Sequence, residues 1–162
     1  MNYLYIGKMV NTHGIKGEIR IISNFKYKEY VFKKEFPLYF GKEKNREVIN
    51  SYRHHKQFEM VTLEGYSNIN EVLKYKGTSV YINRDDLNLK DGEYLNEDLI
   101  NLEVWCDDKK LGVLKKIEQY PSQELLVVVG EKKYLIPYVK EFILKIDLLN
   151  KKIVIKNIKG LI

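Results

Sequence analysis

The hydrophobic residues of this chain fall mostly in short runs that alternate with polar residues and are separated by turn residues. Alternation with a period of two is typical of strands that bury one face. The first half contains the runs YLYIGKMV, GEIRIIS, PLYFG, REVINSY, FEMVTL and SVYI, and the second half contains LEVWC, LGVLKKIEQY, ELLVVV, KYLI and KIVIK. The pattern predicts a mainly β protein built from small barrels or sandwiches.

One segment, SNINEVLKYKG, breaks the alternation and predicts a short helix. Asn68 is a suitable N-cap, Glu71 stands three residues later as in a capping box, and Gly77 follows as a stop signal. The apolar positions of the segment would form one stripe: Ile69, Val72 and Leu73. We expect a helix short enough to cover one end of a barrel.

The polar and acidic segment NRDDLNLKDGEY, residues 83–94, is typical of a connection between domains. We therefore expect a domain over residues 1–84, a linker over 85–90 and a domain over 91–162. Residues 1–84 hold 15 lysines and arginines against 8 acidic residues, a net charge of +7, while residues 85–162 hold 13 against 14, a net charge of −1. The basic first half predicts an acidic partner.

Composition supports β structure and limits the chemistry. The chain lacks alanine, the strongest helix former, and has 13 tyrosines, which suit half-buried strands. Cys106 is the single cysteine, which excludes an intramolecular disulfide and a cysteine-based metal cluster and fits a reducing compartment. No run approaches the roughly 18 apolar residues of a membrane helix, and the start resembles no signal peptide. We expect neither membrane insertion nor export.

The segment VNTHGIKGEIRI, residues 10–21, carries the most distinctive motif. Gly14 and Gly17 would shape a loop between two strands, beside which His13, Lys16 and Arg20 are displayed. A phosphate-binding loop is disfavoured, because no serine or threonine follows a glycine-lysine pair and no long helix follows the strand. The loop either contacts a partner or only closes a barrel, and the sequence leaves both possibilities open.

Catalytic and metal sites are not indicated by the residue pattern. A catalytic histidine needs a second titratable group held by a third, and the sequence around His13 offers none. His54 and His55 would point to opposite faces of a strand, so they cannot chelate one metal ion together. We expect no catalytic residue, no metal and no cofactor.

A basic stretch in the first half is interleaved with aromatic residues, as in surfaces that bind single-stranded nucleic acid. Its aromatic residues either stack on a ligand or belong to the core, since strands bury every other residue. The basic residues are Lys26, Lys28, Lys33, Lys34, Lys42, Lys44 and Arg46, and the aromatic ones are Tyr27, Tyr30, Phe32, Phe36, Tyr39 and Phe40.

Two features stand out in the second half. Tyr94 and Leu95 are adjacent, so on an extended segment they face opposite sides and one is exposed unless another element covers it. Pro137, directly after an apolar run, predicts the end of a strand or a sheet edge. The segment DLLNKK, residues 147–152, predicts a tight reversal.

The ordered motifs resemble the RimM family of ribosome maturation factors. IGKMVNTHGIKGEIRI resembles the N-terminal signature of that family, and VTLEGYSNINEVLKYKGTSVYI resembles its following strand and helix. DGEYLNEDLINLEV, LGVL, YLIPYV, KID and the final GLI follow in the family's order. The resemblance covers essentially the whole chain.

The resemblance implies a six-stranded N-terminal barrel of the translation-factor type, followed by a PRC-barrel. It also implies a cytoplasmic, non-enzymatic and monomeric assembly factor that binds the immature small ribosomal subunit and assists 16S rRNA processing and head assembly. Its partners would be 16S rRNA and the small-subunit head protein uS-nineteen. The alternatives are a PRC-barrel adaptor unrelated to ribosomes, and an enzyme with a related barrel.

The resemblance also indicates where the partners bind. The family usually has two adjacent aromatic residues at the positions of Tyr94 and Leu95, so only the first position matches. The expected contacts to the ribosomal protein are Tyr94, Leu95, Asp98 and Leu99. The expected contacts to rRNA are His13, Lys16, Arg20, Lys42, Lys44 and Arg46.

Overall fold

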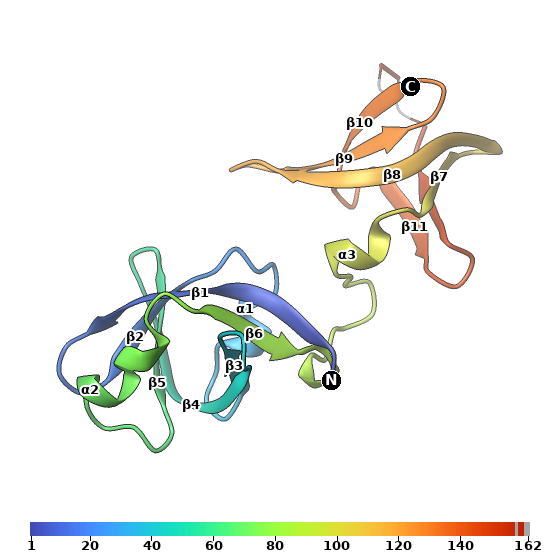
Figure 1. Cartoon of the computed structure of the whole chain (residues 1–162). Helices are drawn as coiled ribbons and strands as arrows, with labels where there is room; N and C mark the ends of the chain where they lie inside the picture. Colours follow the sequence, from blue (N-terminus) through green and yellow to red (C-terminus); the bar gives the residue numbers. More distant parts are fainter. Residues whose placement is uncertain (158, 161–162) are drawn as a thin grey trace. The chain divides into compact units, whose positions relative to one another are not determined.

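The computed structural model describes residues 1–157, 159 and 160, so the last two residues of the GLI motif lie outside the described residues. The chain forms two compact units, Met1–Asn88 and a second unit from Leu89 onward, each with its own hydrophobic core. Figure 1 shows the two units. Counted at this division, the units carry net charges of +5 and +1, because Asp85 and Asp86 belong to the first.

The first unit is a closed barrel of six strands in the order β1-β2-β5-β4-β3-β6. All neighbouring strands in it are antiparallel. The strands are β1 (Tyr3–His13), β2 (Glu18–Ile22), β3 (Pro37–Phe40), β4 (Asn45–His55), β5 (Phe58–Leu63) and β6 (Ser79–Asn83). The six predicted strands and the barrel are thus confirmed.

Alternation along the strands fills the barrel. On β3, Leu38 and Phe40 point into the core while Tyr39 between them does not belong to it. Strand β1 shifts register between Met9 and Asn11, a bulge that helps a strand to bend around a barrel. Gly7 lies where β1 and β2 approach closely, since a Cβ there would be 2.4 Å from the carbonyl oxygen of Ile22.

The predicted helix covers one end of the barrel as α2 (Ile69–Val72), followed by the 3₁₀ turn η1 (Leu73–Tyr75) (Figure 1). The capping box between Asn68 and Glu71 is present. The predicted apolar stripe is wrong in one member, because Leu73 is exposed and Tyr75 is buried instead. A 3₁₀ turn aligns residues three apart, so Tyr75 follows Val72 onto the buried face.

Two short helical elements in the first unit were not predicted. Helix α1 (Lys28–Val31) lies between β2 and β3, and the 3₁₀ turn η2 (Arg84–Asp86) follows β6. With Val31 and Phe32, α1 and its C-cap contribute buried side chains to the barrel core. Four-residue helices leave too few periodic positions for a helical pattern to be recognised in sequence.

The second unit is a six-stranded sheet in the order β10-β9-β8-β7-β12-β11. Its described residues form five neighbour pairs of strands, of which β12 and β7 are parallel and the other four are antiparallel. The strands are β7 (Glu103–Cys106), β8 (Lys109–Gln119), β9 (Glu124–Val129), β10 (Lys133–Pro137), β11 (Ile143–Asp147) and β12 (Lys152–Ile155). The mainly β fold class is therefore confirmed.

Of the two edge strands of this sheet, the sequence predicted β10 and missed β11. Strand β10 is an edge strand that ends at Pro137, as expected, and residues 147–152 join β11 to β12 by a tight reversal. Strand β11 was missed. It is the other edge strand, and Leu144 in it is exposed, so its alternation of apolar and polar residues is weak.

Candidate protein and nucleic-acid interfaces

The β1–β2 hairpin holds the motif that the sequence singled out. Its turn, residues 14–17, has positive φ angles at both glycines, 71° at Gly14 and 93° at Gly17. The backbone amide of Ile69 donates to the carbonyl oxygen of Ile15 at 3.0 Å, and a Cβ on Gly17 would be 3.1 Å from a backbone oxygen of Asn68. The turn is thus fastened to the start of α2, and it presents Lys16 to solvent.

Behind this turn, His13 and Arg20 meet. The Arg20 guanidinium hydrogen-bonds Nδ1 of His13 and lies 5.5 Å from the centre of the Phe58 ring. The ring of His13 lies 6.2 Å from that of His55, which comes from the end of β4. Buried Nε of Arg20 has no hydrogen-bond partner within the described part of the chain. A donor held in this way suits a bound acceptor such as a phosphate oxygen.

Arg53 extends the same group of side chains. Its guanidinium makes a two-pronged ion pair with Glu18, at 2.9 and 2.8 Å. This hydrogen bond is the main reason why the pKa of Glu18 is lowered and that of Arg53 is raised. We call His13, Arg20, Arg53 and His55 the hairpin cluster.

The hairpin cluster carries an excess of positive charge. The pKa of His55 is lowered, first by partial burial and then by the positive charges of Arg53, Lys56, His13 and Arg20. An anion bound beside it would relieve this repulsion. The cluster is therefore a candidate phosphate-binding surface.

Sequence inspection found only half of this cluster. His13 and Arg20 lie in the motif, but Arg53 and His55 reach it from 33 or more residues further along the chain. Arg53 and His55 are two residues apart in the strand REVINSYRHH, which places both on one face, and this spacing was the sequence feature that could have indicated the cluster.

The other three predicted rRNA contacts lie on the β3–β4 hairpin. Lys42 and Arg46 are exposed, and Lys44 is half-buried with a positive φ of 55°. The ammonium group of Lys44 lies 4.2 Å from the centre of the Tyr81 ring and 5.6 Å from that of Tyr3. The two predicted groups of basic residues thus belong to different hairpins, and their contacts do not overlap.

The aromatic residues of the basic stretch are mainly structural. Phe32, Phe36 and Phe40 belong to the barrel core. These three rings are therefore core residues and do not stack on a ligand. Tyr27 is buried, and Tyr30 is packed partly against the core. Packing in the core of the first unit therefore accounts for these side chains, although only Phe40 among them lies on a strand.

A buried carboxylate at the barrel was not predicted. Glu59 is 1% exposed and accepts hydrogen bonds from the Tyr52 hydroxyl at 2.7 Å and from His54 Nδ1 at 3.0 Å. Lys28 Nζ lies 3.6 Å away. Burial alone raises a carboxyl pKa, but the two hydrogen bonds and the charge of Lys28 outweigh it and lower the pKa of Glu59. The pKa of Tyr52 is raised to about 12, by burial and by Glu59.

The predicted contacts for a ribosomal protein lie around helix α3 (Asn96–Leu99) in the second unit. Leu95 is the N-cap residue of this helix and has an extended backbone, with φ −77° and ψ 139°, as expected, whereas the helix over Asn96–Leu99 was not predicted. Leu95 is buried and Leu99 is 0% exposed, so both pack in the core and neither can contact a partner directly in this conformation. Tyr94 is half-buried, and its hydroxyl donates to the carbonyl oxygen of Ile146 at 3.4 Å.

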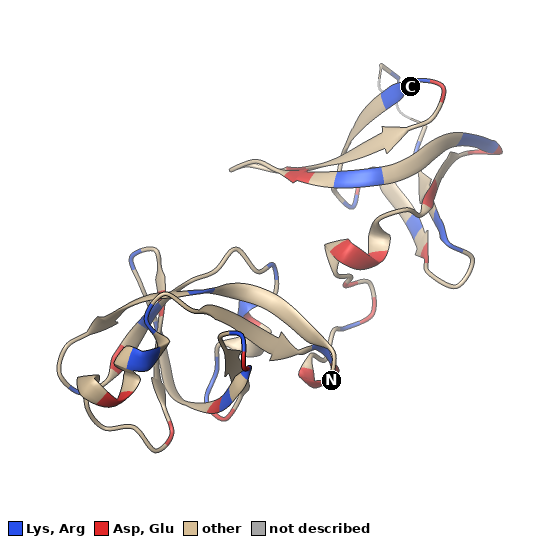
Figure 2. Cartoon of the chain, viewed as in Figure 1, with Lys and Arg blue, Asp and Glu red and all other residues tan. Residues whose placement is uncertain are grey.

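The surface around α3 is acidic. Glu97 is exposed and Asp98 is half-buried in the first turn of the helix, and Figure 2 shows α3 as an acidic element. Residues 91–98 contain four acidic residues and no basic one. Asn96 donates to Glu124 at 2.9 Å, which ties the helix to β9. This acidic surface suits a basic partner.

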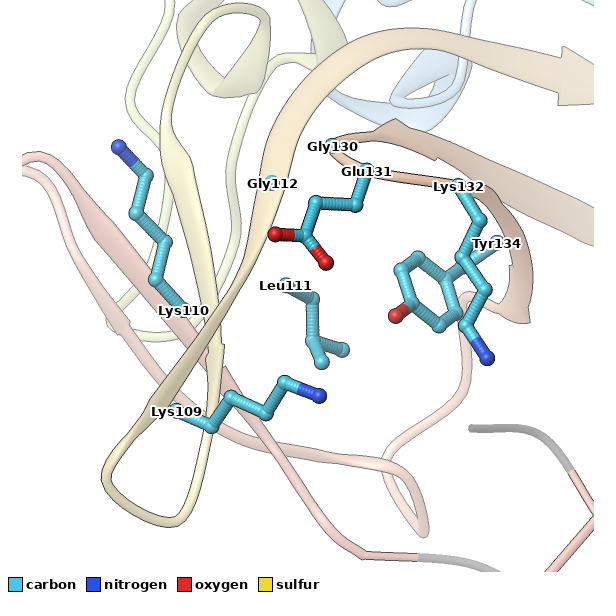
Figure 3. Close-up of a pocket in the computed structure, with 8 residues that line it drawn as sticks. All are labelled: Lys109, Lys110, Leu111, Gly112, Gly130, Glu131, Lys132 and Tyr134. Carbon is cyan, nitrogen blue, oxygen red and sulfur yellow. The ribbon is translucent and has the colours of Figure 1, made fainter.

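A cavity of about 590 Å³ lies elsewhere in the second unit (Figure 3). Its walls are Lys109, Lys110, Leu111, Gly112, Gly130, Glu131, Lys132 and Tyr134. The Lys132 ammonium group lies 5.5 Å from the centre of the Tyr134 ring. Figure 3 shows the Glu131 carboxylate among these lysine side chains, so the cavity is of mixed charge.

Residues 1–157, 159 and 160 contain no group of three or more His, Cys, Asp or Glu side chains that could hold a metal ion. Across the same residues, every helix is too short or too polar to cross a membrane.

The chain thus consists of two small β domains, one with a cationic hairpin and one with an acidic helix, which are candidate binding surfaces of opposite charge. Residues 4–87 match the family model of the RimM N-terminal domain, and residues 96–161 match that of the RimM PRC barrel domain. The chain therefore belongs to the RimM family of ribosome maturation factors, which confirms the family and the fold class expected from the ordered motifs.

Relatives agree with the family models. The ribosome maturation factor RimM of Ligilactobacillus salivarius is 42% identical over 168 residues, covering 99% of each chain. That of Staphylococcus haemolyticus is 38% identical over 162 residues, covering 97% of each. The solution structure of the N-terminal domain of RimM from Thermus thermophilus has a TM-score of 0.47 and 18% identity, covering 55% of this chain and 98% of that one.

Proposed function

We propose that this chain binds the immature small ribosomal subunit at its head and assists 16S rRNA processing and head assembly without catalysing a reaction. The first unit contacts 16S rRNA, and the second contacts the head protein uS-nineteen. The chain acts as a monomer in the cytoplasm. A binding factor shifts a conformational equilibrium only by its difference in affinity for the two states, so preference for the immature particle is sufficient.

The observation that carries this proposal is the opposite charge of the two surfaces. The hairpin cluster offers guanidinium and imidazole groups around a buried Arg20 Nε without a partner in the described residues. Lys16 stands beside it at the exposed turn, where it would contact a phosphate. Helix α3 offers carboxylates instead, which suit a basic ribosomal protein.

The proposed contact with the ribosomal protein includes fewer residues than the four expected from the sequence. Tyr94 and Asp98 are the residues placed to contact a partner, because both retain exposed surface. Leu95 and Leu99 would act indirectly, by holding α3 against the core of the second unit. The two leucines are thus proposed as positioning residues.

Cosedimentation with immature and mature small subunits at graded salt tests the proposal. The chain should pellet with immature particles in preference to mature ones, and binding should weaken as salt rises because bound counterions are released. Equal binding to both particles, or none, would refute the proposal.

Matched charge reversals test the rRNA surface. Lys16→Glu should weaken binding and reduce the slope of log affinity against log salt by roughly 0.7 to 0.9, the value for one lost phosphate contact. Lys115→Glu, at an exposed position of β8 in the second unit, makes the same charge change and should leave the slope unaltered. An equal effect of both variants would indicate a general charge effect and no contact at the hairpin.

Binding to purified uS-nineteen tests the second surface. Tyr94→Ala should weaken this binding roughly tenfold or more, as expected for a tyrosine at the centre of an interface. Lys42→Ala, on the β3–β4 hairpin, should leave it unchanged. The reverse order of effects would place the protein contact on the first unit.

A further inference from the structure

We propose that the outer face of strands β1, β6 and β3 is a stacking surface for the bases of unpaired RNA. This inference rests on the proposed function, which makes RNA the partner of the first unit. It concerns four tyrosines outside the hairpin cluster, of which only Tyr39 belongs to the basic stretch with aromatic residues. We call Tyr3, Tyr5, Tyr39 and Tyr81 the tyrosine row.

Strand pairing builds the tyrosine row. Tyr5 on β1 is opposite Tyr81 on β6, and Tyr81 is opposite Tyr39 on β3. Tyr39 is in turn opposite Arg46 on β4, so a basic residue continues the row. Residues directly opposite on neighbouring strands have Cβ atoms about 4.5 to 5.5 Å apart, so the row runs across the three strands without a gap.

The four rings contact one another edge to face. The ring centres are 5.8 Å apart between Tyr5 and Tyr81, 5.2 Å between Tyr3 and Tyr39, and 6.5 Å between Tyr3 and Tyr81. Edge-to-face packing fixes the rings against each other. A ligand base would therefore meet aromatic surface that is already ordered, which lowers the entropic cost of binding.

The row lies outside the barrel. Its neighbours along the strands, including Ile6, Leu38 and Val80, point into the core, whereas none of the four tyrosines belongs to that core. Tyr5 is 56% exposed, while Tyr39 is only 4% exposed because its neighbours cover it. The row thus combines an accessible ring with a supporting layer beneath it.

Lys44 gives the row its charge. Its ammonium group lies against the rings of Tyr81 and Tyr3, at 4.2 and 5.6 Å from their centres. The amide of Lys44 donates to the carbonyl oxygen of Gly41 at 3.1 Å, which holds the turn that positions it. The same turn contains Lys42 and Glu43. With two lysines and one glutamate, the turn carries a net positive charge.

Aromatic rings beside fixed cations match the chemistry of unpaired RNA. Single-stranded nucleic acid offers flat bases for stacking and phosphates for the cations, whereas a duplex hides the faces of its bases. Lys44 and Arg46 stand where they can neutralise the phosphates of a strand whose bases meet Tyr5 and Tyr81. A single-stranded segment of RNA is therefore the occupant that this surface fits.

Fluorescence anisotropy with the full chain tests the inference directly. The probes are labelled oligouridylate and oligoadenylate of about ten nucleotides, within the size range of single-strand sites, and a duplex of the same length. Tyr5→Ala should raise the dissociation constant for both single strands about 5-fold to 100-fold, the range measured for the loss of one stacked base. Tyr5→Phe keeps the ring and should stay within about twofold of the unsubstituted chain.

A tyrosine of similar exposure serves as the control. Tyr120, in the second unit, is 51% exposed, and Tyr120→Ala should leave the affinity for the single strands unchanged. Salt separates stacking from charge: the effect of Tyr5→Ala should persist as salt rises, and the effect of Lys44→Ala should shrink. Unchanged affinity for Tyr5→Ala, or equal binding of single strand and duplex, would overturn the inference.

The same variants separate this inference from the proposed function. If the chain cosediments with immature subunits but binds neither oligonucleotide, the stacking surface is refuted and the assembly role stands. If it binds the oligonucleotides but not the subunits, the assembly role is refuted alone. Loss of self-association on Tyr5→Ala, with unchanged oligonucleotide binding, would assign the row to a contact between two copies of the chain.

Discussion

The first unit closes its sheet into a barrel, whereas the hydrogen-bonded order of the second unit has two edge strands, β10 and β11. A closed sheet leaves no unpaired edge to which a partner strand could add. Its outer face, which carries side chains such as the tyrosine row, is therefore the surface that can meet a partner. In the second unit, the edge strand β10 ends at Pro137, and the candidate contact residues lie on the acidic helix α3. Two sheets of equal strand number thus present their candidate contact residues in different ways.

The two units also differ in how they can be observed. Each has its own core, so we expect each to unfold as a separate cooperative unit. Trp105, the single tryptophan, lies in β7, and its fluorescence reports the second unit alone. Hydrogen exchange of the β1 and β5 amides reports the first. A variant in one unit should therefore leave the transition of the other unchanged.

The largest expected effect is on the second unit, at Gly130. A Cβ at this position would be 2.0 Å from the carbonyl oxygen of Leu111, so the two backbones must separate. Gly130→Ala should lower the free energy of unfolding of the second unit by about 3 kcal/mol or more, measured by urea unfolding with Trp105 fluorescence. Gly14→Ala is the counterpart in the barrel: φ is +71°, but apart from its two chain neighbours a Cβ there would have no heavy atom of the described residues within 4 Å, so the substitution should cost only about 1 kcal/mol. Similar losses for the two variants would contradict this ranking.

The next effect concerns the core position of Leu99. Leu99→Ala creates a cavity in the second unit and should lower its free energy of unfolding by about 3 kcal/mol, read from the same fluorescence. Leu99→Met conserves the volume and should cost less than about 1.5 kcal/mol. If Leu99→Ala instead left stability intact and abolished binding to uS-nineteen, Leu99 would be a direct contact and its assigned core position would be wrong.

A smaller effect is expected from acid on the first unit, through Glu59. Its pKa is lowered in the folded state, so its contribution to stability is present above the ordinary carboxyl pKa and is lost as pH falls below it. Glu59→Gln should lower the stability of the barrel by about 1 to 2 kcal/mol at about pH 7 and reduce its loss on acidification, measured by hydrogen exchange. Glu64→Gln, at an exposed position just after β5, is the control and should do neither. An unaltered acid response in Glu59→Gln would mean that other carboxylates destabilise the barrel.

The smallest effect is a proton linked to RNA binding at His55. Its pKa is lowered by partial burial and by cationic neighbours, so the free side chain is mainly neutral near neutral pH. A phosphate bound at the hairpin cluster would favour its charged form, and RNA should bind more tightly by less than about tenfold as pH falls from about 7.5 to about 5.5. His55→Gln should remove part of this dependence and His54→Gln, which faces Glu59, should not. Anisotropy at graded pH measures both, and an equal response would place the proton elsewhere.

Sequence patterns predicted the elements better than the sites. The strands, the capping box and the Pro137 edge follow from local rules, since alternation, capping and the missing proline N–H act within a few residues. Strand β11 and helices α1 and α3 were missed because they are short or lie at an edge, where the hydrophobic pattern is weak. The sequence indicated that Tyr94 and Leu95 face opposite sides but not which of them is buried, and the packing of the second unit buries Leu95.

The amino-acid sequence by itself determined a two-part, mainly β chain with a basic first half, because periodicity and charge are properties of neighbours along the chain. Only the tertiary structure brought Arg53 and His55 to the hairpin of His13 and Arg20, buried Leu99, and aligned tyrosines from three strands into one row. Barrel closure and strand register made these contacts. They join residues far apart in sequence, and no local pattern specifies which of them become opposite partners.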